Sequence, residues 1–141
     1  MSSSLSEQNQ AGRAWIQAFY DKMGSDTFDI ESWYNEFFQV DATLTHNSAP
    51  AIKGLNDICA HIVGNRARQS AKYVVKHVDV VPNRIYTEID ALITLKNDPQ
   101  KMKIILSGLA VFHKKTDESK LSALRTYVDS TPLMERIRAI S

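Results

Sequence analysis

The sequence has only one cysteine, Cys59, and no excess of charge of either sign, since 17 basic residues face 16 acidic ones. A single cysteine excludes a disulfide within the chain, and no group of cysteine and histidine residues has the spacing of a zinc site. The balanced charge argues against a nucleic-acid-binding protein, which usually carries a basic face, and against an acidic solvating tail.

Long hydrophobic runs are also missing. No stretch approaches the roughly 18 apolar residues of a membrane helix, and the polar start of the chain lacks the apolar segment of a secretion signal. Ser2 stands where N-myristoylation requires glycine. The glycine-rich nucleotide motifs and the GxSxG motif of serine hydrolases are absent. We therefore expect a cytoplasmic protein without a cofactor and without a membrane or nucleic-acid partner.

The order of patterns along the chain predicts the domain organisation. The Ser-, Gln- and Asn-rich residues 1–9 are predicted to be disordered, ahead of a single domain over residues 10–141. Apolar residues then recur at helical spacing over residues 11–23, 30–38 and 55–64. Asp29 has the position of an N-cap for the second of these helices.

The remainder of the chain is mostly strand. β-Branched and alternating patterns predict strands over residues 40–48, 73–81, 84–96, 103–113 and 121–129, with a hairpin turn at Pro82-Asn83. Thr131-Pro132 begins a short final helix. Helices first and a meander last indicate an α+β fold, in which three helices pack on one face of a curved antiparallel sheet.

A bent sheet wrapped around helices forms a cone, whose cavity is mostly apolar with a few convergent polar groups. The predicted inward faces carry Thr87 and Ile89 on the strand 84–96, and Leu44 and His46 on the first strand. On the last strand the alternation places one group inward with Leu121: Arg125, Tyr127 and Asp129.

Asp129 is the leading catalytic candidate. A carboxylate against apolar walls has a raised pKa and can exchange protons near neutral pH. The alternative is a cap for the final helix, where aspartate is common. His46 is the second candidate, because imidazole titrates near neutral pH. His61 falls outside the apolar stripe of its helix and is expected at the surface, and Arg66 is expected at a solvated helix end.

For several other side chains the sequence allows two interpretations. Glu88 and Asp90 lie opposite the isoleucine face of their strand, so we expect them outside, unless a bulge moves them in. The aromatic residues of the first two helices, Trp15 among them, are mostly core. Tyr20 and Tyr34 carry hydroxyls that need partners if buried, so either could donate to a ligand oxygen.

The pattern resembles the SnoaL-like polyketide cyclase group of the nuclear transport factor 2-like superfamily. The resemblance covers roughly residues 11–138 and is carried by residues 33–44, 52–54, 107–112 and 124–129. It implies a cone-shaped fold and cofactor-independent acid/base chemistry, with Asp129 where several relatives place a carboxylate and His46 where some place a polar group. Ile89 and Ala91 stand where limonene epoxide hydrolases have an Arg and an Asp, which argues against that reaction.

Together these features predict an isomerase, cyclase or dehydratase for a hydrophobic, carbonyl-containing natural product of secondary metabolism. Asp129 and His46 would be catalytic. The substrate-binding residues would be Trp15, Tyr20, Tyr34, Leu44, Thr87, Ile89, Arg125 and Tyr127. The alternatives are a non-catalytic module that binds a small molecule or a protein, and an epoxide hydrolase. A homodimer is expected in each case, because the outer sheet face carries Val74, Val78, Tyr86 and Leu92.

Overall fold

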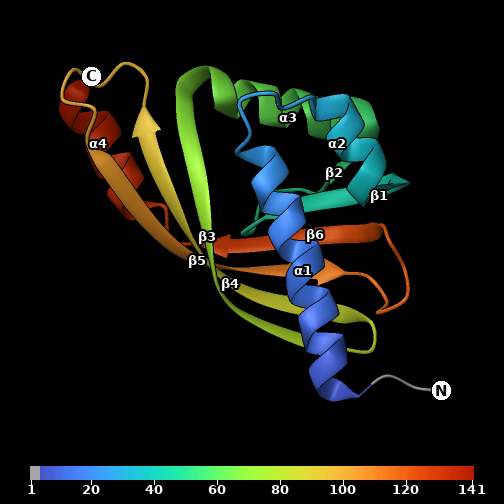
Figure 1. Cartoon of the computed structure of the whole chain (residues 1–141). Coiled ribbons are helices and arrows are strands. Elements are labelled where there is room, and N and C mark those ends of the chain that lie inside the picture. The colour runs from blue at the N-terminus through green and yellow to red at the C-terminus, as the bar shows by residue number, and fades with distance from the viewer. Residues whose placement is uncertain (1–3) are drawn as a thin grey trace.

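The structure, a computed structural model, describes residues 4–141 and contains helices on one side of a six-stranded sheet (Figure 1). The helices are α1 (Leu5–Met23), α2 (Ile30–Phe37), α3 (Gly54–Arg68) and α4 (Thr131–Ile140). The strands are β1 (Phe38–His46), β2 (Ile52–Lys53), β3 (Gln69–Val81), β4 (Arg84–Leu95), β5 (Lys103–His113) and β6 (Leu121–Val128). The predicted α+β class is confirmed.

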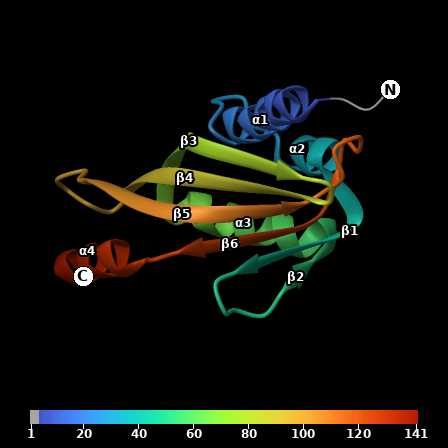
Figure 2. The same ribbon diagram turned by 90° about the horizontal axis from the view of Figure 1, so that it is seen from below.

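The sheet has the strand order β2-β1-β6-β5-β4-β3, and β3 is therefore an edge strand. β1 runs parallel to β6, whereas the other neighbouring pairs are antiparallel, so the sheet is mixed rather than wholly antiparallel. Viewed from below, α1 lies along β3, and α4 lies apart from the other helices, beyond the end of β6 (Figure 2). The sheet thus curves around α1, α2 and α3.

The first helix begins earlier than the sequence predicts. Ser4 caps it by accepting a hydrogen bond from the backbone N–H of Glu7 at 3.1 Å. Asn9 accepts another from the backbone N–H of Val80 at 3.1 Å, which ties this part of the helix to β3. Residues 5–9 are therefore helical, and the disordered tail predicted there is wrong for them. Residues 1–3 lie outside the described part of the chain.

The side chains predicted to point inward are correct on β4, but some of the predicted directions on β3 and β6 are wrong. Thr87 and Ile89 are buried on the inner face, as expected. On β3, a register shift between Val75 and His77 turns Val78 inward, so its predicted place on the outer face is wrong. A bulge of this kind inserts one residue and reverses the alternation that follows it.

On β6, too, the side chains that point inward are the opposite set from the predicted one. The register between β1 and β6 shifts after Phe38, and Leu121 and Leu124 are both buried although they are an odd number of positions apart, three. Leu124 lies opposite Phe112, and the alternation puts Arg125 and Tyr127 on the outer face. Their predicted inward position is therefore wrong.

Two hydrophobic clusters hold the helices on the sheet. The closed end of the cone is packed with aromatic rings from α1, α2, β1 and β5: Trp15, Phe19, Trp33, Tyr34, Phe37, Phe38 and Phe112. The other cluster joins Leu133 and Ile140 of α4 to β4 and β5, through Ile93, Leu95 and Leu106. Burial of this apolar area favours both contacts.

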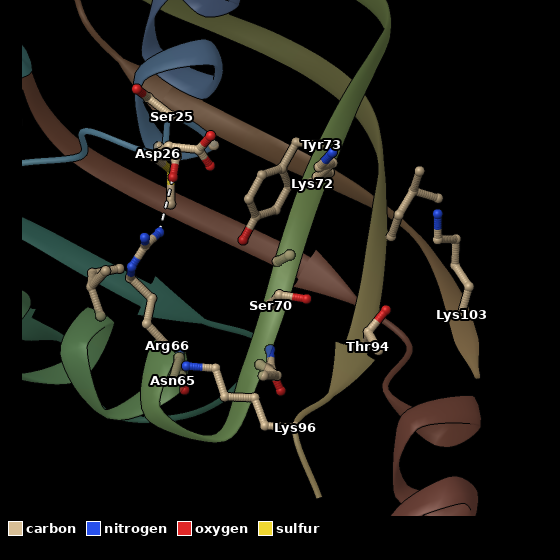
Figure 3. A pocket seen from close by; sticks show the side chains of 16 residues that line it. Ser25, Asp26, Asn65, Arg66, Ser70, Lys72, Tyr73, Thr94, Lys96 and Lys103 are labelled. Carbon is tan, nitrogen blue, oxygen red and sulfur yellow. Dashed lines mark hydrogen bonds between the residues drawn. The ribbon is translucent and has the colours of Figure 1, made fainter. Parts of the chain in front are cut away.

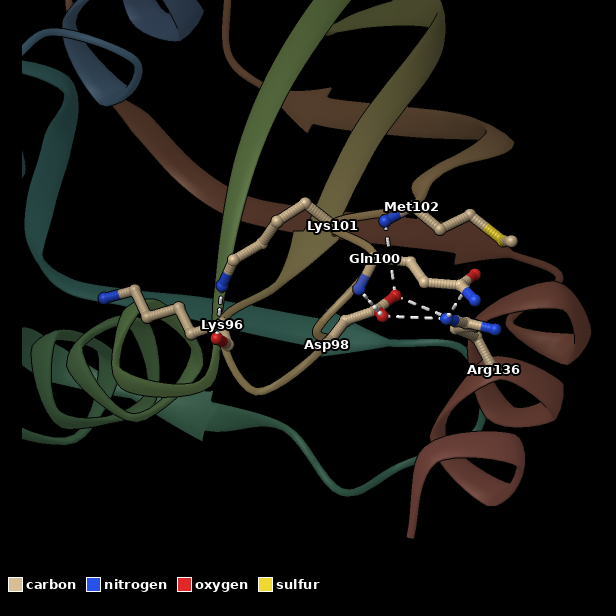
Figure 4. A network of polar contacts seen from close by, with 6 residues as sticks. All are labelled: Lys96, Asp98, Gln100, Lys101, Met102 and Arg136. Carbon is tan, nitrogen blue, oxygen red and sulfur yellow. Dashed lines mark hydrogen bonds and ion pairs between the residues drawn. The ribbon is translucent and has the colours of Figure 1, made fainter.

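A buried ion pair fastens α4 to the loop between β4 and β5 (Figure 4). The carboxylate of Asp98 has no exposed side-chain surface and accepts hydrogen bonds from Arg136 at 2.7 and 2.8 Å. The backbone N–H groups of Gln100 and Met102 donate to the same carboxylate. Arg136, together with these N–H groups, holds the pKa of Asp98 well below its usual range.

Candidate functional site

A groove of about 440 Å³ opens at the edge of the sheet, around the first half of β3 (Figure 3). Its walls come from the loop after α1, the last turns of α3, the first residues of β3, the far end of β4 and the start of β5. Because α3 passes directly into β3 at Arg68 and Gln69, these two elements meet at a sharp corner beside the groove. A volume of this size is sufficient for a small organic molecule.

The alternation of β3 gives the groove two sides. Ala71 and Tyr73 lie opposite Ile93 and Ala91 of the buried face, so they point inward. Ser70 and Lys72 consequently point outward. Both sets line the groove, which therefore extends around the exposed edge of the strand.

Tyr73 lines the inner side of the groove, and Tyr20 packs against it from α1 without lining the groove itself. The rings of Tyr20, from α1, and Tyr73, from β3, are 4.9 Å apart between centroids, and only 5% of Tyr20 is exposed. Burial raises the pKa of both phenols. Neither hydroxyl has a hydrogen-bond partner among residues 4–141. Both therefore remain protonated at neutral pH and are able to donate to a ligand oxygen.

Arg66 brings a fixed cation to the same side. Its Nη1 donates to the backbone oxygen of Met23 at 3.0 Å, and its guanidinium lies over the ring of Phe28 at 4.6 Å from the centroid. The Arg66 charge opposes the effect of burial on the pKa of Tyr73. A negative charge that develops on a bound oxygen would be favoured by the same cation.

His61 lies one turn before Asn65 on α3. Nδ2 of Asn65 contacts Nε2 of His61 at 3.3 Å, and Oδ1 of Asn65 accepts from Arg68 at 2.8 Å. Burial lowers the pKa of His61, and the charges of His46 and Arg68 lower it further. The imidazole is therefore neutral at neutral pH and has a nitrogen that can accept a proton.

The structure places Asp129 away from any buried face. Its side chain is exposed and accepts hydrogen bonds from the backbone N–H of Thr131 at 3.0 Å and from its hydroxyl at 2.6 Å. These bonds lower the pKa of Asp129, whereas a raised pKa was predicted. The prediction is wrong because the strand ends at Val128 and the carboxylate accepts hydrogen bonds from Thr131 at the start of α4. The N-cap position that the sequence suggested for Asp129 belongs to Ser130, which makes no side-chain cap hydrogen bond.

His46 keeps its predicted face but is engaged in holding the sheet end together. Its Nδ1 hydrogen-bonds with the hydroxyl of Thr126 at 2.7 Å, and its Nε2 lies 3.4 Å from Asn47. Asn47 in turn donates to the backbone oxygen of Val128 and accepts from its N–H. These contacts join the ends of β1 and β6, and the predicted pairing of His46 with a buried Asp129 is not formed.

Most predicted substrate-binding residues belong to the core or the outer face. Trp15 packs in the closed end and donates to the backbone oxygen of Ser119 at 2.9 Å. The hydroxyl of Tyr34 donates to Gln39 and Val40. Leu44, Thr87 and Ile89 are buried, and Oγ1 of Thr87 has no hydrogen-bond partner within residues 4–141. Arg125 bonds to His113 and to Tyr127 on the outer face. Tyr20 alone, through Tyr73, adjoins the groove.

Sequence reasoning missed His61, Arg66 and Tyr73. His61 is three residues after the buried Ile58, a spacing that places both on neighbouring parts of one helix face. Tyr73 lies two residues before the buried Val75, within strand spacing of the same face. For Arg66 the sequence offers no signal, because its partners Met23 and Phe28 come from a distant loop.

Residues 4–141 contain no group of three or more His, Cys, Asp and Glu side chains arranged to hold a metal ion. Among the described helices, none has both the length and the apolar character of a membrane span.

No protein-family model and no curated protein matches the sequence. Solved structures do match over nearly the whole chain. A protein named as a SnoaL-like polyketide cyclase from Jannaschia sp. CCS1 has a TM-score of 0.76 at 13% identity and covers 100% of this chain and 96% of its own. A protein named as an isomerase from Bacillus subtilis has a TM-score of 0.74 at 14% identity and covers 93% of this chain and 95% of its own.

A third similar structure is an epoxide hydrolase of the limonene epoxide hydrolase-like type from Mycobacterium tuberculosis, with a TM-score of 0.71 at 10% identity, covering 94% of this chain and 93% of its own. At these identities the likeness concerns the fold. The chain has the nuclear transport factor 2-like fold of the SnoaL-like and ketosteroid isomerase-like proteins, as the sequence resemblance predicted. A fold of this kind carries several activities, so function depends on the residues of the site.

Proposed function

We propose that this protein is a cofactor-independent enzyme that transfers a proton on a carbonyl-bearing small molecule bound at the β3 groove. The names of the similar structures, which include cyclases and isomerases, support this reaction class. The observation that carries the proposal is the pair Tyr20 and Tyr73, whose rings pack together and whose protonated hydroxyls form no hydrogen bond within the described chain, with Tyr73 and Arg66 both lining the groove.

In this mechanism Tyr73, which lines the groove, binds the carbonyl oxygen, and the ring of Tyr20 packs against it. Loss of a proton from the adjacent carbon shifts negative charge onto that oxygen, and preorganised donors stabilise the resulting enolate more than the ketone. The raised pKa of each phenol keeps its proton in place for this hydrogen bond. Arg66 adds a favourable charge nearby.

His61 is the proposed base, replacing Asp129 in that role. Its lowered pKa leaves the imidazole neutral, and Asn65, which contacts Nε2, also lines the groove. A substrate C–H that displaces the Asn65 amide would reach this nitrogen. The protonated imidazole could then return the proton to another carbon, which completes an isomerisation without a redox partner.

Hydrogen–deuterium exchange at the α-carbon of 2-tetralone in D₂O, followed by NMR, tests the chemistry without knowledge of the natural substrate. The wild type is expected to accelerate exchange over buffer, His61→Gln to lose about a hundredfold of that rate, and Tyr73→Phe about tenfold. Tyr86→Phe, on the outer face, is the matched control and should retain full activity. Wild-type exchange at the buffer rate, or full activity in His61→Gln, would refute the mechanism.

A non-catalytic small-molecule-binding module is the second candidate. The closed end of the cone is filled by the protein's own aromatic rings, and Asp129 lies in solvent, and both observations favour binding over catalysis. This candidate predicts that 2-tetralone binds with chemical-shift changes near Tyr73 but exchanges no faster than in buffer. Epoxide hydrolysis gains no support, because Ile89 and Ala91 are buried apolar residues in the positions where that reaction needs charge.

We propose for the assembly a homodimer that buries the part of the outer sheet face around Leu109 and Tyr127, away from the β3 groove. Leu109 and Tyr127 lie opposite each other on this face, and Tyr127 is 43% exposed. Exposed apolar area of this kind favours association. Light scattering at micromolar concentration should give the dimer mass for the wild type and the monomer mass for Tyr127→Glu. A monomeric wild type would contradict the proposal.

A further inference from the structure

We propose that the outer part of the groove binds an anionic group, so that the ligand is an apolar molecule carrying a carboxylate, sulfonate or similar charge. This inference rests on the proposed function only in taking the groove as the ligand site. It names the substrate class, which neither the fold nor the similar structures assign.

The charge of the groove is strongly one-sided, although the whole chain is nearly neutral. Four basic residues line it, Arg66, Lys72, Lys96 and Lys103, against a single carboxylate, Asp26. A concave surface with one sign of charge raises the local concentration of oppositely charged ligands and accelerates their association.

Three of these cations have no protein counter-charge. Within the described chain, Lys72, Lys96 and Lys103 form no ion pair. Lys76, on the same strand as Lys72, does form an ion pair, with Asp90 at 3.7 Å. The repulsion between the groove lysines is therefore left for a ligand to relieve.

The strand register places hydroxyl donors between two of the lysines. Thr94 lies opposite Lys103 on β5 and opposite Ser70 on β3, so these three side chains form one row across the outer face. Lys72 stands two residues further along β3 on the same face. In Figure 3 the hydroxyls of Ser70 and Thr94 lie between the elements that carry Lys72 and Lys103. Hydroxyl and ammonium groups together are typical donors to carboxylate and sulfonate oxygens.

The next row supplies an apolar contact. Leu92 lies opposite Lys72 on one side and Ile105 on the other, and Ile105 is 57% exposed. An anion whose body is aromatic or aliphatic would contact Leu92 and Ile105 while its charged group reaches the lysines. A small inorganic anion would leave this apolar surface exposed, so the arrangement favours an amphipathic organic anion.

Two fluorescent probes of nearly equal shape test the inference. 8-Anilinonaphthalene-1-sulfonate carries a sulfonate, whereas N-phenyl-1-naphthylamine is its neutral analogue. At low ionic strength the wild type should bind the sulfonate about tenfold more tightly than the neutral probe. Lys72→Gln/Lys103→Gln should weaken sulfonate binding by about tenfold, at up to about fivefold per lysine, and leave the neutral probe unchanged. Raising the salt concentration should remove most of the difference.

Lys53→Gln is the matched control, because Lys53 is exposed on β2 at the opposite edge of the sheet and its loss changes the net charge equally. It should leave both affinities unchanged. The inference is overturned if the double variant binds the sulfonate as tightly as the wild type, or if Lys53→Gln weakens it equally. Complete displacement of the sulfonate by millimolar inorganic phosphate would likewise overturn the amphipathic assignment.

The result of the probe-binding experiment can be distinguished from the result of the exchange experiment that tests the proposed chemistry. 2-Tetralone is neutral, so its exchange by the wild type depends on His61 and Tyr73, whereas the preference for the sulfonate probe depends on Lys72 and Lys103. Exchange by the wild type together with lysine-dependent sulfonate binding supports both proposals. Absence of exchange with lysine-dependent sulfonate binding refutes the chemistry alone.

Discussion

Asp98→Asn is expected to lower the melting temperature by on the order of 10 °C. The substitution keeps the shape of the side chain but removes the charge that pairs with Arg136. Arg136 is only 16% exposed in its side chain, so its guanidinium would remain largely desolvated without a counter-ion. Breaking one member of a buried pair is costly for this reason, and circular dichroism melting curves measure the loss.

The pair of Asp98 and Arg136 also makes the stability of the protein depend on pH in the acidic range. Because hydrogen bonds from Arg136 and from the backbone depress the pKa of Asp98, the folded state favours the ionised carboxyl. This contribution is complete above the pKa of an unfolded aspartate, roughly 4, and decreases as the pH falls through the lower folded pKa. The wild type should therefore lose its advantage over Asp98→Asn progressively below about pH 4.

Asp79→Asn is the control for the removal of one carboxylate. Asp79 is exposed and pairs with the exposed His77, so its loss should shift the melting temperature by less than about 2 °C. If Asp98→Asn melts like Asp79→Asn at neutral pH, the pair does not hold α4. Cleavage of the native protein by trypsin near Arg138 should be faster in Asp98→Asn, since α4 carries no buried residue of its own.

Gly108→Ala is expected to destabilise the protein by about 2–3 kcal/mol. Gly108 lies opposite Val128, at the point where β6 leaves the sheet towards α4. A Cβ atom there would approach Cγ2 of Val128 to 2.5 Å and the backbone oxygen of Tyr127 to 2.8 Å. The backbone of β6 cannot rotate away as a side chain could, so the two strands must separate. Urea denaturation measures the change in the free energy of unfolding.

Gly64→Ala gives the opposite result and serves as the control. Gly64 is within α3, and a Cβ there meets nothing closer than Arg68 at 3.9 Å. Alanine should therefore stabilise the helix by up to about 1 kcal/mol, since it restricts the unfolded chain and favours helical backbone. A Gly108→Ala variant as stable as the wild type would show that β5 and β6 separate without cost.

The strands whose alternation is unbroken were predictable from the sequence. β5 begins and ends at the predicted residues, Lys103 and His113, and the buried face of β4 follows a strict period of two. On β3 and β6 a register shift reverses the side-chain direction, and the sequence does not mark where that shift occurs. Val78, Arg125 and Tyr127 were therefore placed on the wrong face.

The candidate site was harder to predict than the fold, because its members come from separate elements. The hydroxyl of Tyr20 is predicted from the sequence to need a partner, but its neighbour Tyr73 comes from the edge strand β3. His61 is expected to be exposed when its helix is considered alone, whereas in the folded chain it is half-buried and its pKa is lowered. Lys103 and Lys72 lie 31 positions apart in the sequence, and the pairing of β3, β4 and β5 brings them to one face of the sheet.

The sequence by itself determined the order of helices and strands, the α+β class and the buried face of β4, since these depend on local periodicity and on turn residues such as Pro82. Only the tertiary structure decided which polar groups share a site. In the folded chain the leading candidate carboxylate, Asp129, is exposed to solvent, and the groove is formed by the end of a helix together with an edge strand. The physical reason is that backbone periodicity is a local property, whereas burial, pKa and the pairing of charges depend on neighbours that distant parts of the chain supply.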